Sequence, residues 1–262
     1  MEYNHSIYSS NIMKDLDYII EYKPLLFNRE SKNNVYYDSA TNRYVPRASE
    51  VISYIVDQSG LISWANHLGF NSERYTDAMN SSQSIGTNAH KMIDRFLNND
   101  RDGVMSIYNH CKEESVNAFY AFMAFYKKIT NRFGASVVFK EHSIVSRYFG
   151  GTIDGVFKIE DRYWLVDYKT SNKVRLNHLL QLAAYSLLLE WQYNMYIDNA
   201  IILKLDKYSK EYKEYNIDLT TDSTFSDMFR SARDAFMSGL LWYYNARIVE
   251  LPFYKFSSSK KS

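Results

Sequence analysis

The spacing of apolar residues changes from a helical to a strand period at residue 136, and this change constrains the fold more than any other feature. In segments 136–149, 151–160 and 163–171, apolar and aromatic residues alternate with polar ones, as in β-strands. A polar turn at 160–162 joins the last two as a hairpin. Further segments are predicted as strands at 199–207 and 211–219, and as helices at 82–98, 113–134, 175–193 and 222–247.

The residues before this region predict a smaller hairpin followed by helices. Residues 34–46 alternate around a polar turn at Asp38–Asn42, which indicates two short antiparallel strands. Residues 47–70 follow a helical period that Gly60 and Gly69 interrupt. We therefore expect a helical N-terminal extension on the main sheet.

No Pro- or Gly-rich linker divides the chain, so we expect one α/β domain over residues 1–255. Its architecture would be a central mixed β-sheet flanked by helices. Residues 1–110 would supply the N-terminal hairpin and helices, and residues 111–255 the core. The polar residues 256–262 are predicted to be a disordered tail.

Composition excludes several classes of protein. The formal net charge is +1, so a nucleic-acid partner would need a local basic surface. Cys111 is the only cysteine, which excludes an internal disulfide and a four-cysteine zinc or iron–sulfur site. The N-terminus lacks the pattern of a signal peptide, and no apolar stretch approaches the ~18 residues of a membrane span. We expect a cytoplasmic protein without membrane partners, including the case of a viral protein in its host's cytoplasm.

Two acids and a lysine stand on the predicted hairpin 151–171. Because strand side chains alternate, Asp167 and Lys169 point the same way, and Asp154 on the preceding strand can approach Asp167. Two neighbouring carboxylates repel unless a cation lies between them or one is protonated. Mg²⁺ favours carboxylate oxygens, water and phosphate oxygens, and a nearby lysine can orient a water. These two acids and the lysine are suited to metal-assisted hydrolysis of a phosphodiester. The simpler alternative is that Asp167 and Lys169 form an ion pair on the surface.

The same residues resemble the D…(D/E)xK signature of the PD-(D/E)XK nuclease superfamily in "GTIDGVF…WLVDYKTS". "GTNAH" resembles the G-x-x-H helix of the RecB-like and phage exonuclease branch and falls on His90. "VVFKEHSIVS" resembles the strand that carries an upstream glutamate, here Glu141. "HLLQLAAYSLLL" resembles the Q-x-x-x-Y helix, matching Gln181 and Tyr185.

The resemblance extends over residues 44–190, because "YVPRASEVI" and "LISWANHLGF" resemble the opening of phage and mitochondrial-genome-maintenance-type exonucleases. Two features depart from the family pattern. Ile153 replaces the proline before the first aspartate, and the cysteine cluster of the iron–sulfur members is absent. The chain also lacks a P-loop, so no helicase motor is expected within it.

The resemblance implies a role for each candidate residue. His90, Glu141, Asp154, Asp167 and the carbonyl of Tyr168 would bind Mg²⁺ or Mn²⁺. Lys169 would position or activate the attacking water, and Gln181 and Tyr185 would position phosphate or the lysine. Each role has a structural alternative. His90 could be a core histidine whose hydrogen bonds are made within the protein, and Glu141 could be an exposed glutamate on a strand. Gln181 and Tyr185 could simply form hydrogen bonds to the backbone.

Three basic residues near the predicted strands could contact DNA phosphates, namely Lys173, Arg175 and Arg147. Lys140 is a further candidate of this kind, and for each of these residues the alternative is a solvated charge. We assign no role to His142 or His178, which are expected to be exposed or boundary residues, and Cys111 is expected to be inert.

The predicted function is therefore a metal-dependent DNA exonuclease acting on single-stranded or duplex ends. Resemblance to the phage branch suggests a setting in replication, recombination or repair, with phage recombination or replication proteins as partners. Two alternatives remain open. One is a structure-specific endonuclease or resolvase of the same superfamily, and the other is a nucleic-acid-binding subunit whose site has lost catalysis.

Overall fold

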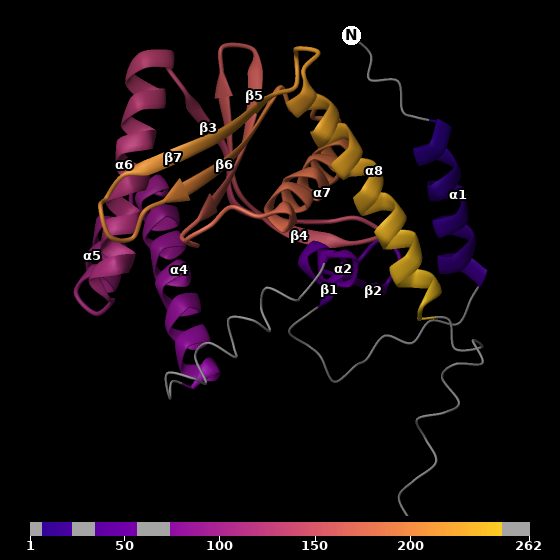
Figure 1. The fold of residues 1–262 in the computed structure, drawn as a ribbon, viewed down its shortest axis with the longest axis horizontal. Coiled ribbons are helices and arrows are strands. Elements are labelled where there is room, and N and C mark those ends of the chain that lie inside the picture. Colours follow the sequence, from indigo (N-terminus) through magenta and orange to yellow (C-terminus); the bar gives the residue numbers. More distant parts are fainter. Residues whose placement is uncertain (1–6, 23–34, 57–73, 248–262) are drawn as a thin grey trace, which may run out of the picture.

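A computed structural model describes residues 7–22, 35–56 and 74–247 (Figure 1). Its centre is a five-stranded mixed sheet of order β3-β4-β5-β6-β7, in which only the β5–β6 pair is parallel. The predicted fold class, a mixed α/β sheet flanked by helices, is confirmed. The strands are β3 (Ser136–Val145), β4 (Gly150–Ile159), β5 (Arg162–Lys169), β6 (Asn199–Leu205) and β7 (Tyr212–Asp218).

Helices cover both faces of this sheet (Figure 1). On one face α4 and α6 pack with Phe157, Val166 and Leu203 of the strands. On the other, α7 and α8 pack with Leu165 and Ala200, and α1 and α2 extend that layer. The bounds are α1 (Ile7–Tyr22), α2 (Ala48–Ile55), α4 (Tyr75–Leu97), α5 (Arg101–Tyr108), α6 (Glu113–Phe133), α7 (Leu176–Tyr193) and α8 (Thr224–Asn245).

Helix α7 makes the crossover that a parallel strand pair requires, because β5 and β6 run in the same direction. Its residues from His178 to Glu190 are buried apart from Gln181, which is why this segment is almost uniformly apolar. The turn from β5 into α7 therefore leaves the carboxyl end of β5 beside the amino end of a buried helix. Asp167 and Lys169 lie at that end of β5.

Most predicted bounds agree with the structure to within two residues, and the differences are local. Helix α4 begins at Tyr75, seven residues before the predicted start, because its first turns are polar and show no apolar stripe. Helix α5 was not predicted. Asp100 caps that helix by accepting a hydrogen bond from the amide of Gly103 at 2.9 Å.

The predicted N-terminal hairpin is present as β1 (Val35–Asp38) and β2 (Arg43–Pro46), paired in antiparallel register. Gly150 at the start of β4 allows it to pack closely, since a Cβ there would lie 2.5 Å from the ring of Tyr36. The predicted breaks at Gly60 and Gly69 and the tail 256–262 lie outside the described residues. None of the helices within the described ranges is long and apolar enough to cross a membrane.

Candidate metal centre

Three side chains from three different elements meet at one point. His90 comes from α4, Glu141 from β3 and Asp154 from β4. His90 Nδ1 lies 3.1 Å from Glu141 Oε1 and 3.4 Å from Asp154 Oδ1. One ligand atom from each residue falls within 4.8 Å of the other two. This spacing would allow a single cation to contact all three.

Strand register explains why the two carboxylates share this point. The pairs Lys140–Gly155 and His142–Ile153 frame Glu141, so the same register sets Glu141 opposite Asp154. Residues directly opposite each other in an antiparallel pair project on the same face. Glu141 itself has a left-handed backbone, with φ of 40°, which is uncommon for a residue other than glycine. Such backbone strain is often found at functional sites.

His90 is fixed by its second ring nitrogen and by the close approach of α4 to β5. Nε2 lies 3.2 Å from the carbonyl oxygen of Tyr168. One turn earlier, Gly86 faces the end of β5, where an added Cβ would lie 3.2 Å from Thr170 Oγ1. The glycine and histidine of the "GTNAH" motif thus act together, because the small residue allows the helix to bring the imidazole to the strands.

Asp167 and Lys169 form the adjacent part of the site. Lys169 Nζ donates a hydrogen bond to Asp167 Oδ1 at 2.8 Å and lies 2.7 Å from Oδ2. The Asp167 side chain is only 1% exposed, so this is not a surface ion pair. Asp154 Oδ2 accepts a hydrogen bond from the amide of Tyr168 at 2.7 Å, which ties β4 to β5 between the two acids.

The pKa values show that the two aspartates have different electrostatic environments. Burial raises the pKa of Asp167 to about 7, and the Asp154 charge adds to this, against the opposing effect of Lys169. Burial also acts to raise the pKa of Asp154, but His90 and Lys169 outweigh it, and the pKa is lowered. Burial acts to lower the pKa of His90, yet Asp154 and Glu141 raise it to about 10. The carboxylates of Asp154 and Glu141 thus favour positive charge at this point.

Gln181 and Tyr185 share one face of α7, as their spacing predicts, and are bonded to each other rather than to backbone. Gln181 Nε2 donates to the Tyr185 hydroxyl at 2.7 Å. Burial, followed by the charges of Asp167 and Asp154, raises the pKa of Tyr185 well above its ordinary value, so the phenol keeps its proton. The ring also lies against β4, because a Cβ at Gly151 would be 2.5 Å from Tyr185 Cε1.

The predicted phosphate-contacting residues have different surroundings. Lys173 and Arg175 are exposed between β5 and α7, near the candidate centre. Arg147 instead forms ion pairs with α1, at 3.4 Å from Asp17 and 3.0 Å from Glu21. Lys140 donates to the carbonyl oxygen of Leu97 at 2.8 Å. Of these cations, Lys173 and Arg175 are the better placed to meet a substrate.

His178 is not the exposed or boundary residue that the sequence suggested. It is buried in the first turn of α7, where its Nδ1 accepts a hydrogen bond from the amide of Arg175 at 3.3 Å. Burial, with the nearby charges of Lys169 and Arg175, lowers its pKa to about 4. The sequence could not indicate this, because it does not show how deeply α7 starts in the core.

The pKa of His178 predicts a loss of stability in acid. The unfolded chain, with a histidine pKa near 6.5, binds more protons than the folded chain between pH 6.5 and 4. Stability should therefore fall as pH decreases through this window. The variant His178→Gln keeps a hydrogen-bond acceptor but does not titrate. Between pH 7 and 5 its free energy of unfolding should fall by about 1–2 kcal/mol less than that of the parent. Urea unfolding at both pH values measures this, and equal losses in the two proteins would contradict it.

The donor set fits a hard divalent cation. Glu141 and Asp154 offer carboxylate oxygens, His90 offers a ring nitrogen, and the carbonyl of Tyr168 is already directed at His90. The raised pKa of His90 has the same cause, because its neighbouring carboxylates favour positive charge where such a cation would act. A metal ion that binds to histidine and carboxylate ligands displaces protons from them. A divalent cation would therefore take the place of a proton on His90.

Comparison with known proteins agrees with this chemistry. A family model described as the PD-(D/E)XK nuclease superfamily matches residues 64–241 of the 262-residue chain. A search of curated proteins finds no match. Among solved structures, 17 chains match. One is titled "Crystal structure of SSO0001", with 15% sequence identity, coverage of 57% of this chain and 71% of that chain, and a TM-score of 0.28. The family match includes every side chain of the candidate centre, from His90 to Tyr185.

Proposed function

The chain belongs to the PD-(D/E)XK nuclease superfamily, and we propose that it is a metal-dependent deoxyribonuclease that degrades DNA from its ends. The observation that carries this proposal is the meeting of His90, Glu141 and Asp154 within 4.8 Å. Beside them lies the buried pair of Asp167 and Lys169. A site that had lost catalysis would have no need to keep all five groups together.

In this proposal His90, Glu141, Asp154 and Asp167, with the carbonyl of Tyr168, hold Mg²⁺ or Mn²⁺. When bound, the ion would supply positive charge beside the scissile phosphate and acidify an attacking water. The hydrogen bond from the Tyr168 amide to Asp154 keeps that carboxylate in place on the β4 side. Glu141 and His90 approach from the edge strand and from α4, so the site closes only when all three elements are folded.

Lys169 would orient the attacking water and offset the charge that develops on the phosphate. Its ammonium group is held by Asp167 and is 17% exposed, so it can reach a substrate without leaving its carboxylate. Gln181 and the protonated phenol of Tyr185 would offer hydrogen bonds to the phosphate or to water from the α7 side. Lys173 and Arg175 would contact the neighbouring phosphates.

Support for an exonuclease comes from the motifs that resemble the RecB-like and phage branch. Gly86 and His90 of α4 act as a unit in the structure, and Gln181 bonds Tyr185 on α7. The preference for an exonuclease rests on the resemblance of the His90 helix and of the region from Trp64 to Gly69 to that branch, and the second region lies outside the described residues. A role in phage-type replication, recombination or repair, with proteins of those processes as partners, follows from the same resemblance.

Cleavage of labelled DNA tests the proposal. End-labelled linear single-stranded and duplex DNA, together with a circular single strand, are incubated with the protein in Mg²⁺, Mn²⁺ or EDTA. We expect loss of the linear DNA in either metal, none in EDTA, and an intact circle. The labelled end that is lost first gives the polarity.

Two other outcomes would change the assignment. A cut circle would show an endonuclease or resolvase, since a circle has no end. Tight binding of DNA without cleavage in either metal would indicate a binding subunit, and the five-residue cluster would then need another explanation.

A further inference from the structure

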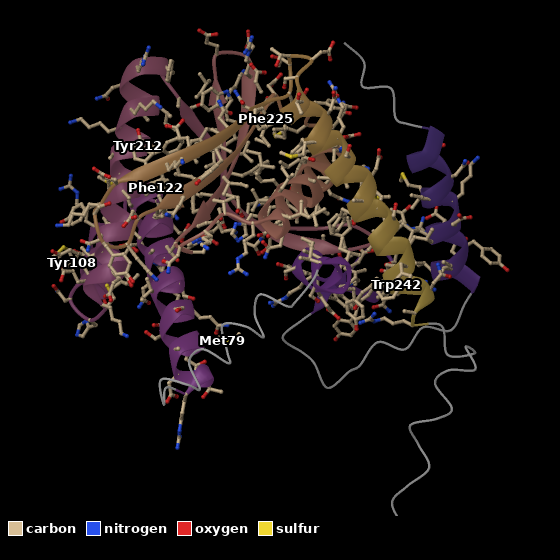
Figure 2. All side chains as sticks on the ribbon, in the orientation of Figure 1. Met79, Tyr108, Phe122, Tyr212, Phe225 and Trp242 are labelled. Carbon is tan, nitrogen blue, oxygen red and sulfur yellow. The ribbon has the colours of Figure 1, made fainter. Side chains whose placement is uncertain are left out.

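An open groove of about 620 Å³ lies between α5, the start of α6 and the turn that joins β6 to β7. Tyr108 and Tyr120 line it and are 37% and 42% exposed. Lys210 from the β6–β7 turn closes the third side, with its Nζ 5.6 Å from the centre of the Tyr120 ring. Figure 2 shows Tyr108 at the end of α5, at the side of the molecule where this turn lies.

The β6–β7 turn presents further groups of the same kind. Tyr208 is 68% exposed, and Lys207 Nζ lies 5.4 Å from its ring centre. The turn is held in shape by Asp206, whose carboxylate accepts hydrogen bonds from the amides of Tyr208 and Ser209 at 2.8 and 3.0 Å. Asn117 of α6 fastens it to the groove by donating to the carbonyl oxygen of Lys207 at 3.1 Å. Aromatic and cationic groups are thus displayed on a fixed backbone.

Strand β6 links the candidate centre to the groove along the chain, because it pairs with β5 and the turn that follows it lines the groove. Lys204 is the register partner of Lys169, so the strand that flanks the centre carries a second lysine at the same level. The chain reaches Lys207 three residues later, within about 10 Å at the rise of an extended strand. Both features lie at the carboxyl ends of the parallel strands β5 and β6, and the turn after β6 reaches α5 and α6 (Figure 1).

We propose that this groove binds a single-stranded segment of the DNA substrate outside the point of cleavage, an inference that rests on the proposed function. Exposed tyrosine rings stack on bases of any sequence, and lysines beside them meet the phosphates. The groove also contains Glu113, which would repel a phosphate but can accept a hydrogen bond from an N–H group of a base. The backbone of the strand would therefore follow Lys207 and Lys210, with its bases toward the tyrosines.

The chemistry favours a single strand over a duplex, because ring stacking needs exposed base faces. Lys207 and Lys210 bring positive charge to the β6–β7 turn, with Asp206 and Glu211 flanking them in the sequence, although the chain has almost no net charge. A nearly neutral protein can bind a polyanion only through local cations such as these.

The test compares binding and cleavage by the parent and by Tyr108→Ala/Tyr120→Ala. Binding of a fluorescent oligothymidylate of about 25 nucleotides is measured in EDTA, where no cleavage occurs. We expect the double variant to bind about 5- to 100-fold more weakly, as for the loss of stacked bases. In Mg²⁺ its KM for the same strand should rise by a similar factor while kcat at saturating DNA is unchanged. Lys210→Ala should lower the salt dependence of binding by about 0.7 in the log–log slope.

Matched variants separate stacking from other effects. Tyr108→Phe/Tyr120→Phe keeps both rings and should bind as the parent does, whereas loss of binding by this variant would overturn the stacking role. Tyr196→Ala and Lys158→Ala change exposed residues at the opposite ends of the strands and should have no effect. Circular dichroism and thermal unfolding confirm that each variant is folded.

The outcomes distinguish this inference from the proposed function. If the parent cleaves DNA and the alanine variants bind and cleave as it does, the groove has no role with DNA and the inference fails alone. If the parent neither binds nor cleaves DNA in any metal, the proposed function itself fails. Weaker binding with unchanged kcat supports both.

Discussion

Replacing Lys169 with alanine, or Asp167 with asparagine, is expected to lower the rate of DNA cleavage at least about 1,000-fold without unfolding the protein. The reason is the position of the pair. Lys169 Nζ lies within 2.8 Å of both oxygens of Asp167, beside the carboxylates and imidazole that would hold the ion. Initial rates on end-labelled linear DNA in Mg²⁺ give the size of the effect.

The two substitutions differ in their expected cost to the fold. Asp167→Asn keeps the shape of a side chain that is 1% exposed and removes its charge. Lys169→Ala leaves that carboxylate buried without its ammonium partner, although the raised pKa of Asp167, about 7, allows it to take up a proton. We therefore expect Lys169→Ala to be the less stable of the two. Urea unfolding of both variants shows whether lost activity reflects chemistry or folding.

A surface pair of the same residue types provides the control. Lys158 and Asp161 lie 3.4 Å apart at the β4–β5 turn, with side chains 41% and 103% exposed. Substituting them in the same way should leave cleavage within a factor of about two, because exposed ion pairs contribute little. A Lys169→Ala protein that cleaves DNA at the parent rate would rule out the proposed role of this lysine.

The part of the site that the sequence could predict is the part built by neighbours in the chain. Asp154, Asp167 and Lys169 stand on one hairpin, and strand alternation alone places the last two on one face. His90 is far from them in sequence and Glu141 stands on the strand before the hairpin, and only the resemblance to a family singled them out. Their approach depends on how α4 packs on the sheet and on the left-handed backbone of Glu141, neither of which leaves a local pattern.

Other features could not be predicted for the same reason. The burial of His178 depends on the depth of α7 in the core, and the ion pairs of Arg147 depend on α1 packing beside it. The groove at Tyr108 and Tyr120 is assembled from two helices and a turn, and tyrosine is so common in this chain that composition pointed to no particular ring. In contrast, the sheet and its main helices follow from periodicity, because each buries a continuous apolar face.

Gly155 packs so closely against the buried ring of Tyr168 that the site has no room for a larger residue. The sequence does not reveal this contact, and replacing Gly155 should have a large effect on stability. A Cβ at this position in β4 would lie 2.3 Å from the hydroxyl oxygen of Tyr168 and 3.0 Å from Phe157 Cε2. Tyr168 is fully buried against α6, with its ring 5.1 Å from that of Phe122, and cannot move aside. We expect Gly155→Ala to lower the free energy of unfolding by about 2–3 kcal/mol, as overpacking in a core does.

The hydroxyl oxygen of Tyr168 is the atom that a Cβ at Gly155 would meet first. It is buried and has no hydrogen-bond partner among the described residues, so Tyr168→Phe removes an unsatisfied polar group and should be neutral or stabilising by about 1 kcal/mol. The same change removes the atom that a Cβ at Gly155 would strike. The double variant Gly155→Ala/Tyr168→Phe should therefore recover at least half of the stability lost by Gly155→Ala.

Urea unfolding of the four proteins in this cycle measures the coupling between the two positions. Additive effects would show that the cost of Gly155→Ala arises elsewhere, for example at Phe157. Cleavage assays on the same proteins link packing to the candidate centre, because the carbonyl of Tyr168 contacts His90 and its amide holds Asp154. If the strain from Gly155→Ala shifts that backbone, cleavage should fall in the single variant and recover with stability in the double variant.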